Sequence, residues 1–166
     1  SSLSMALFGE NIPTDVYANL IRTVRSALPV FHRYLRLRKS VLKLDELHAY
    51  DLSVPLVDEL DWKISYADAI RLITEALAPL GKDYVSIVGQ AWNQRWIDVY
   101  ENEGKRSGAY SWGAHRVHPY ILLNHEDTLN GMFTIAHEMG HALHSYLADA
   151  QQEFRYAGYS IFVAEI

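Results

Sequence analysis

Apolar residues recur at intervals of three and four positions over most of the chain, which is the spacing of one face of an α-helix. The first such stretch follows Pro13, and we expect its helix to be kinked or divided at Pro29. Later helical stretches are predicted at residues 65–81, about 83–100 and about 127–148. The pattern therefore predicts a mainly α-helical fold.

The pattern changes between the last two helical stretches. Residues 104–108 are rich in turn formers, and residues 109–112 and 120–123 have the composition of short strands. We therefore expect a small β-sheet or hairpin around residues 106–124, inside an otherwise helical chain.

The composition limits the classes of function that the chain can have. With 166 residues, 49% of them apolar, the chain is long enough for one domain around one core. Its formal net charge of -5 argues against a nucleic-acid partner. It has no cysteine, which excludes disulfides, cysteine-bound zinc and thiol catalysis and fits a cytoplasmic protein. No signal peptide or apolar run of membrane-spanning length is visible, so we expect no membrane partner.

A five-residue motif in the last long helical stretch carries the strongest chemical signal. His137, Glu138 and His141 form the pattern H-E-x-x-H. Residues four apart lie on one helix face, so the two imidazoles can bind a single zinc ion. Glu138 can then accept a proton from a zinc-activated water as that water attacks a peptide carbonyl. At this chain's histidine and glutamate frequencies the pattern would arise by chance roughly 0.02 times, which disfavours a plain surface helix.

Gly140 lies inside the same motif. Glycine in a helix interior costs about 1 kcal/mol relative to alanine, so its presence there calls for a reason. We expect a neighbouring element or a bound peptide to approach the helix closely at Gly140.

A catalytic zinc site needs a third protein ligand and an open fourth position. His144 lies a further turn along the helix, so we expect it to support the site or to pack rather than to bind the ion. Glu153 lies in a polar stretch and is expected to be solvated. Glu165 has apolar neighbours in sequence, and a carboxylate buried among them would need a cation. We therefore predict Glu165 as the third ligand, with a helix-surface glutamate as the alternative.

A family resemblance rests on five segments, which are residues 46–52, 104–110, 118–124, 133–145 and 162–166. With them the chain resembles the M3 family of zinc oligopeptidases, in particular its bacterial oligoendopeptidase F group, along essentially its whole length. Two positions depart from the family pattern: His125 stands where tyrosine is expected, and Gly131 where a polar residue is expected. Both lie outside the predicted metal site, so we expect local effects only.

The resemblance implies a helical, zincin-type peptidase with a deep channel that admits short peptides and excludes folded proteins. It implies one zinc ion held by His137, His141 and Glu165, with Glu138 as the catalytic base. In this family context we expect the glycine-rich loop to shape the peptide channel, with substrate near Tyr110, His115 and His118. A phosphate-binding loop is the alternative for residues 104–108, but the lysine and threonine of such a loop do not follow.

The resemblance also implies that the chain is incomplete. Family members are several times longer, so we expect residues 1–166 to be a partial catalytic domain that lacks the N-terminal lobe and the C-terminal part of the cleft. The apolar run at residues 159–166 stops without a helix cap, which is consistent with a cut polypeptide. We expect the residues that stabilise the oxyanion to lie in the missing part.

Three hypotheses remain open from the sequence. The leading one is a zinc endopeptidase that hydrolyses internal bonds of short oligopeptides. The second is a truncated piece without activity of its own, which requires the complementary remainder of the chain to form the cleft. The third is another glutamate-zincin class, such as a carboxypeptidase. The oligomeric state is not predicted by any feature of the sequence.

Overall fold

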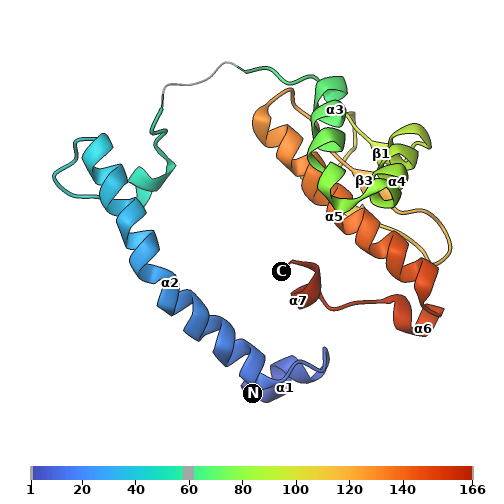
Figure 1. The fold of residues 1–166 in the computed structure, drawn as a ribbon, viewed down its shortest axis with the longest axis horizontal. Helices are drawn as coiled ribbons and strands as arrows, with labels where there is room; N and C mark the ends of the chain where they lie inside the picture. The colour runs from blue at the N-terminus through green and yellow to red at the C-terminus, as the bar shows by residue number, and fades with distance from the viewer. Residues whose placement is uncertain (1, 58–61, 166) are drawn as a thin grey trace. The chain divides into compact units, whose positions relative to one another are not determined.

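The structure is a computed structural model that describes residues 2–57 and 62–165. It divides into two compact units, residues 1–60 and 61–166 (Figure 1). None of the helices in the described ranges is long and apolar enough to span a bilayer.

The first unit is built on one long helix. It contains α1 (Leu3–Phe8), α2 (Thr14–Val41) and the 3₁₀ turn η1 (Ala49–Ser53). Asp15 in the first turn of α2 and Arg38 and Lys39 in its last turn complement the helix dipole. The predicted division at Pro29 is wrong, because α2 continues through it. A proline removes only its own N–H bond and crowds one carbonyl, which a helix with several turns on each side can absorb.

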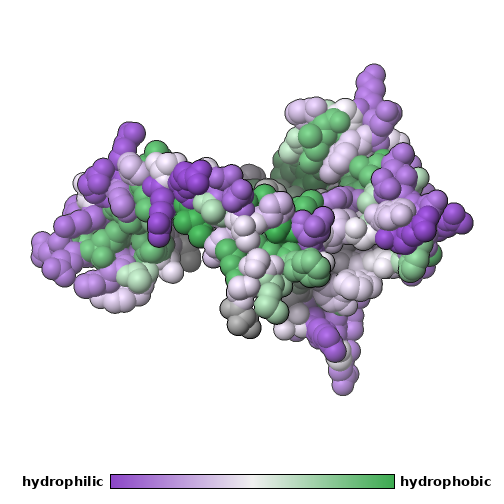
Figure 2. All heavy atoms as spheres, turned by 90° about the horizontal axis from the view of Figure 1, so that it is seen from below, coloured by the Kyte–Doolittle hydropathy of each residue, from purple (hydrophilic) through white to green (hydrophobic). Residues whose placement is uncertain are grey.

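The apolar side chains of the first unit have no core of their own. Arg38 is the single buried residue among residues 2–57, and its guanidinium donates to the carbonyls of Asp51 and Val54 at 2.7 and 2.5 Å. Figure 2 shows apolar side chains at the surface of the molecule. The large apolar residues of α2 that are exposed include Val16, Leu20, Val24, Leu28 and Phe31. The single core that the length predicts therefore lies in the second unit.

The second unit packs helices around a small sheet. Its elements are α3 (Tyr66–Ala76), η2 (Ala78–Leu80), α4 (Lys82–Asn93), β1 (Ile97–Asp98), β2 (Tyr110–Trp112), β3 (Tyr120–Leu122), α5 (Leu129–Gln151), α6 (Phe154–Ala157) and α7 (Ile161–Ala164). The mainly helical fold with a small sheet is confirmed. Helix α5 packs against α3, α4, β2 and β3, and α6 and α7 lie on its other side (Figure 1).

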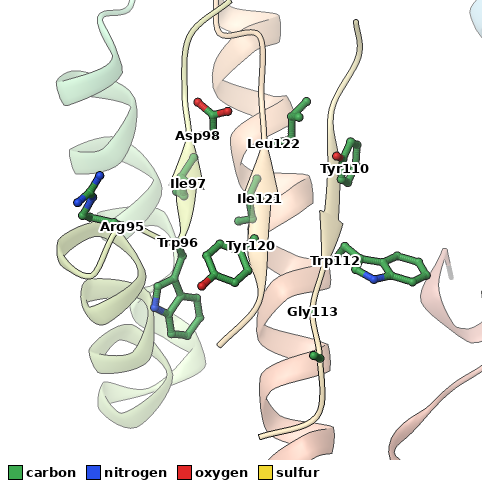
Figure 3. Close-up of a pocket in the computed structure, with 11 residues that line it drawn as sticks. Arg95, Trp96, Ile97, Asp98, Tyr110, Trp112, Gly113, Tyr120, Ile121 and Leu122 are labelled. Carbon is green, nitrogen blue, oxygen red and sulfur yellow. The ribbon is translucent and has the colours of Figure 1, made fainter. Parts of the chain in front are cut away.

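The sheet has the order β1-β3-β2, with β1 parallel and β2 antiparallel to β3 (Figure 3). Residues 97–98 were predicted to be helical, and that prediction is wrong. Helix α4 ends at Asn93, Arg95 takes a positive φ of 62°, and Ile97 then pairs with Ile121. The apolar spacing continued past the helix end because Trp96 is a core residue, so periodicity alone did not mark the boundary.

The core of the second unit is formed by buried apolar residues from α3, α4, the sheet and one face of α5; they are Ile64, Ala69, Ile73, Val88, Ala91, Trp96, Ile121, Leu123, Ile135, Met139, Ala142 and Leu143. Because this core holds one side of α5, the opposite side is free to carry polar groups. His137 and His141 lie on that opposite side, four residues apart.

Of the two approaches expected at Gly140, the one by a neighbouring element is not found, and the one by a bound peptide stays a prediction. A Cβ added at Gly140 would meet nothing within 4 Å in the described part of the chain. Gly131 instead has the tight surroundings, since a Cβ there would collide with the carbonyl oxygen of Glu126 and lie 3.2 Å from the ring of His125. The two positions that depart from the family pattern therefore touch each other.

Candidate active site and metal centre

Three of the predicted site residues converge in space. Nε2 of His137 and Nε2 of His141 are 3.0 Å apart, and their rings are nearly perpendicular at 86°. The carboxylate of Glu165 lies 3.9 Å from the His137 nitrogen and 3.6 Å from the His141 nitrogen. The three ligand atoms thus lie within 4.8 Å of one another.

This donor set fits a zinc ion. A tetrahedral ion with metal–nitrogen distances of about 2.0–2.1 Å places two of its ligand atoms roughly 3.3 Å apart. The two nitrogens are 3.0 Å apart, Oε2 of Glu165 lies 3.9 Å from the His137 nitrogen and Oε1 lies 3.6 Å from the His141 nitrogen, so these separations lie on both sides of that value. Two imidazoles and a carboxylate are also ligands that zinc accepts in catalytic sites.

Glu165 reaches the histidines by a return of the chain after α5. The chain passes through α6 and Tyr159, and Ser160 then caps α7 by accepting a hydrogen bond from the Val163 N–H at 3.3 Å. Glu165 is the C-cap residue that directly follows this short helix. The carboxylate is not buried as predicted, because its side chain is 51% exposed. Its position opposite the two histidines therefore comes from the path of the chain rather than from burial.

Glu138 lies beside the cluster and is buried, with 7% of its surface exposed. Burial raises the pKa of this carboxyl, while the nearby His141 and His137 lower it and Glu165 raises it again. A hydrogen bond from the backbone of Ser111, in β2, also lowers the pKa by stabilising the charged form. The carboxylate is thus held between α5 and the sheet.

These residues line a groove of about 830 Å³. Strand β2 lines the groove, together with α5 and the α6–α7 segment. In the described part of the chain β2 pairs only with β3, so its other edge is unpaired. A second hollow of about 850 Å³ lies at the sheet residues drawn in Figure 3, but it includes none of the clustered ligands.

The other predicted residues are distributed differently. Tyr110 and His115 line the groove, and Nδ1 of His115 lies 3.3 Å from Oδ1 of Asp149. His118 is absent from the groove lining: its ring stacks on Trp96 with centroids 5.1 Å apart and planes 2° apart. His144 stacks on Tyr159. Glu153 is exposed and pairs with Arg155 at 2.9 Å, as its polar surroundings predicted.

Sequence reasoning missed several residues that line the groove, among them Ser145, Asp149 and Tyr159. A signal was available for two of these three. Ser145 and Asp149 continue the four-residue spacing of His137 and His141. Residues four apart lie on nearly the same side of an α-helix, so all four residues lie along one side of α5. Tyr159 had no comparable signal, because its position depends on the return of the chain.

The sequence profile of peptidase family M3 matches residues 1–166. The chain belongs to peptidase family M3. It is 49% identical over 166 residues to oligopeptidase PepF of Bacillus subtilis and 45% identical to group B oligopeptidase PepB of Streptococcus agalactiae. Each alignment covers all of this chain, but only 25% and 28% of those relatives.

A solved structure also shares the fold. A crystal structure from Chlamydophila abortus superposes with a TM-score of 0.87 and 44% sequence identity, over 99% of this chain and 27% of that one. The chain thus spans about a quarter of the length of the M3 proteins it matches.

Proposed function

We propose that the chain is part of a zinc metallopeptidase that hydrolyses internal bonds of short oligopeptides. The observation that carries this proposal is the convergence of His137, His141 and Glu165 within 4.8 Å, in a groove that Glu138 also lines. The names of the M3 relatives, which are oligopeptidases and oligoendopeptidases, support the same substrate class.

In this proposal His137, His141 and Glu165 hold one zinc ion per chain. Zinc bound by such ligands polarises a carbonyl oxygen and lowers the pKa of water, which is the chemistry that amide hydrolysis requires. The two histidines lie on the long helix α5, whereas Glu165 directly follows the separate short helix α7. The ligand set is therefore complete only when α7 is docked.

Glu138 acts as the general base. Its carboxylate accepts a proton from the attacking water and passes it to the departing amine, which needs a carboxyl whose pKa lies closer to neutrality than that of a solvated glutamate. Burial shifts the pKa of Glu138 in that direction. Glu138 and Ser111, in β2, both line the groove.

The peptide binds in the groove beside β2. An extended peptide can pair its backbone with an unpaired strand edge, and this edge lies among the residues that line the groove. Tyr110 and His115 then contact substrate. His118 is proposed to contribute through the loop before β3, because its ring is held by Trp96 and Tyr120.

Residues 1–166 are proposed to be part of a catalytic domain, with the N-terminal lobe and the rest of the cleft supplied by further chain. The length of the relatives supports this. The donors that stabilise the oxyanion then lie outside residues 1–166. Such donors lower the activation free energy of the reaction by about 3 kcal/mol. The lack of cysteine supports a cytoplasmic location.

The test uses the full-length polypeptide, with zinc content and cleavage of quenched fluorescent peptides as readouts. Glu138→Gln should retain zinc and lose about 10²- to 10⁴-fold in kcat. His141→Ala should lose zinc as well as cleavage. Glu153→Gln is a matched control that should leave both unchanged. Unchanged cleavage by a zinc-loaded Glu138→Gln variant would exclude Glu138 as the base.

A second candidate is that the 166-residue piece has no activity of its own and works only with its complementary remainder. The exposed apolar face of α2 favours this candidate, because such a face is normally covered. Cleavage by the purified piece, alone and after mixing with the complementary fragment, distinguishes the two. Activity of the piece alone at the full-length rate would exclude the second candidate.

A further inference from the structure

We infer that His115 and Asp149 form a subsite that binds a cationic group of the substrate peptide, an ammonium or a guanidinium, at the end of the groove away from the metal ligands. This inference rests on the proposed peptidase function. It concerns selectivity rather than the chemical step.

The two side chains meet from separate elements. His115 lies in the loop between β2 and β3, Asp149 lies in the last turns of α5, and Nδ1 and Oδ1 are 3.3 Å apart. Both side chains are largely withdrawn from solvent, with 13% and 18% exposed, and both line the groove. The rings of Phe154 and His115 lie edge to face, with centroids 5.7 Å apart and planes 75° apart. The pair is thus a polar spot in a partly desolvated wall.

The charge of the groove favours a cation at this spot. Among the residues that line the groove in the described part of the chain there is no lysine or arginine, and Asp149 is the one acidic residue among them that the proposed zinc site does not use. Among the residues that the structure describes, Nδ1 of His115 is the side-chain partner of the Asp149 carboxylate. A carboxylate with little solvent gains more from a cationic partner than an exposed one does. The open ring of Phe154 offers a further surface for a cation.

The position of Asp149 along α5 sets its distance from the metal ligands. Asp149 follows His141 by eight residues, which corresponds to about 12 Å of α-helix. An extended peptide rises about 3.3 Å per residue, so a chain lying along α5 reaches Asp149 roughly three to four residues from the bond at the metal centre. The cationic group is then a lysine or arginine side chain at that distance, or the free α-amino group of a short peptide.

The test uses the full-length polypeptide and peptides that carry a single lysine, glutamate or methionine, scanned over five positions on each side of the cleaved bond. Mapping the products fixes the register of each peptide. We expect lysine three or four residues from the bond, on one side, to raise kcat/KM about tenfold over glutamate. Acetylated and free peptides are compared to separate the side-chain ammonium from the terminal amine.

The deciding variant is Asp149→Asn, which removes the charge and keeps a group that can accept a hydrogen bond from His115. It should bring the lysine-to-glutamate ratio, or the free-to-acetylated ratio, close to one, while cleavage of the methionine peptides stays within twofold. Asp83→Asn, the same change at an exposed position of α4, should leave every ratio unchanged. An unaltered ratio in Asp149→Asn overturns the inference.

A purely structural tie between the loop and α5 would give a different result. It would lower the midpoint of thermal unfolding and the cleavage of all peptides alike, with no change in the ratio. If no peptide is cleaved at all, the proposed function fails, and the subsite is then judged by binding alone. That binding is measured by the fluorescence anisotropy of labelled lysine and glutamate peptides, with the unchanged protein and with Asp149→Asn.

Discussion

His144 lies flat against Tyr159, with ring centroids 3.7 Å apart and ring planes 11° apart. The hydroxyl of Tyr159 also lies 2.7 Å from the hydroxyl of Ser145, on the next position of α5. Two adjacent residues of α5 therefore hold one tyrosine of the returning chain, six residues before Glu165. His144, predicted to support the site or to pack rather than to bind the ion, touches a residue that lines the groove.

The hold on Tyr159 predicts an effect on metal affinity. Tyr159→Phe keeps the stack on His144 but removes the hydroxyl contact with Ser145, so the segment that carries Glu165 should lose order. We expect zinc affinity of the full-length polypeptide to fall about tenfold, as is common for residues that orient ligands. Competition with a chromogenic chelator measures it. Tyr156→Phe, at an exposed position of α6, is the control; equal affinities in all three proteins would refute the prediction.

The two glycines of α5 predict opposite effects on stability. Gly131→Ala places a methyl group against the carbonyl of Glu126 and the ring of His125, and should destabilise the fold by about 1–3 kcal/mol. Gly140→Ala meets nothing within 4 Å and should stabilise the helix by about 1 kcal/mol. Urea unfolding of the two variants measures the free energies, and a common sign would contradict the close approach at Gly131.

Lys105 is predicted to hold the loop before β2. Its side chain is 3% exposed, and Nζ donates to the carbonyls of Tyr100 at 2.6 Å and Asp98 at 3.2 Å. Lys105→Met keeps the apolar stem and removes these bonds, so we expect a loss of about 2 kcal/mol in the free energy of unfolding. Hydrogen exchange at the backbone of β2 should become faster. Lys82→Met, at an exposed position, should change neither quantity. If hydrogen exchange in Lys105→Met is as slow as in the unchanged protein, Lys105 does not hold this loop.

Tyr66 predicts a loss of stability in alkali. Burial, and then the nearby Tyr100, raise the pKa of Tyr66 to about 12 from an ordinary value of 10. The folded state therefore keeps its proton where the unfolded state loses it, so the contribution of Tyr66 to stability is complete below pH 10 and is lost as the pH rises toward 12. Tyr66→Phe should show a shallower decline of the free energy of unfolding between pH 10 and 12. Parallel curves for the two proteins would show that another group is responsible.

Much of the fold could be predicted because its signals are local. Apolar spacing located α3, α4 and α5, and turn-forming residues located β2 and β3 between them. It failed at Trp96, which kept the helical spacing as a core residue although the chain turns at Arg95. The expectation of a division at Pro29 failed for a local reason, because a long helix can absorb one proline. Gly140 has no close neighbour, while the crowded glycine of α5 is Gly131.

The candidate site divides in the same way. The sequence alone determined the pair His137 and His141 and the place of Glu138 beside them, because one helical turn sets the distance between residues four apart. Only the tertiary structure decided how Glu165 reaches that pair, how Tyr159 holds the returning segment, and that His115 meets Asp149. Those contacts join residues 14 to 34 positions apart, and their distances depend on how every intervening turn directs the chain. No local spacing encodes such a path, so it had to be read from the packed structure.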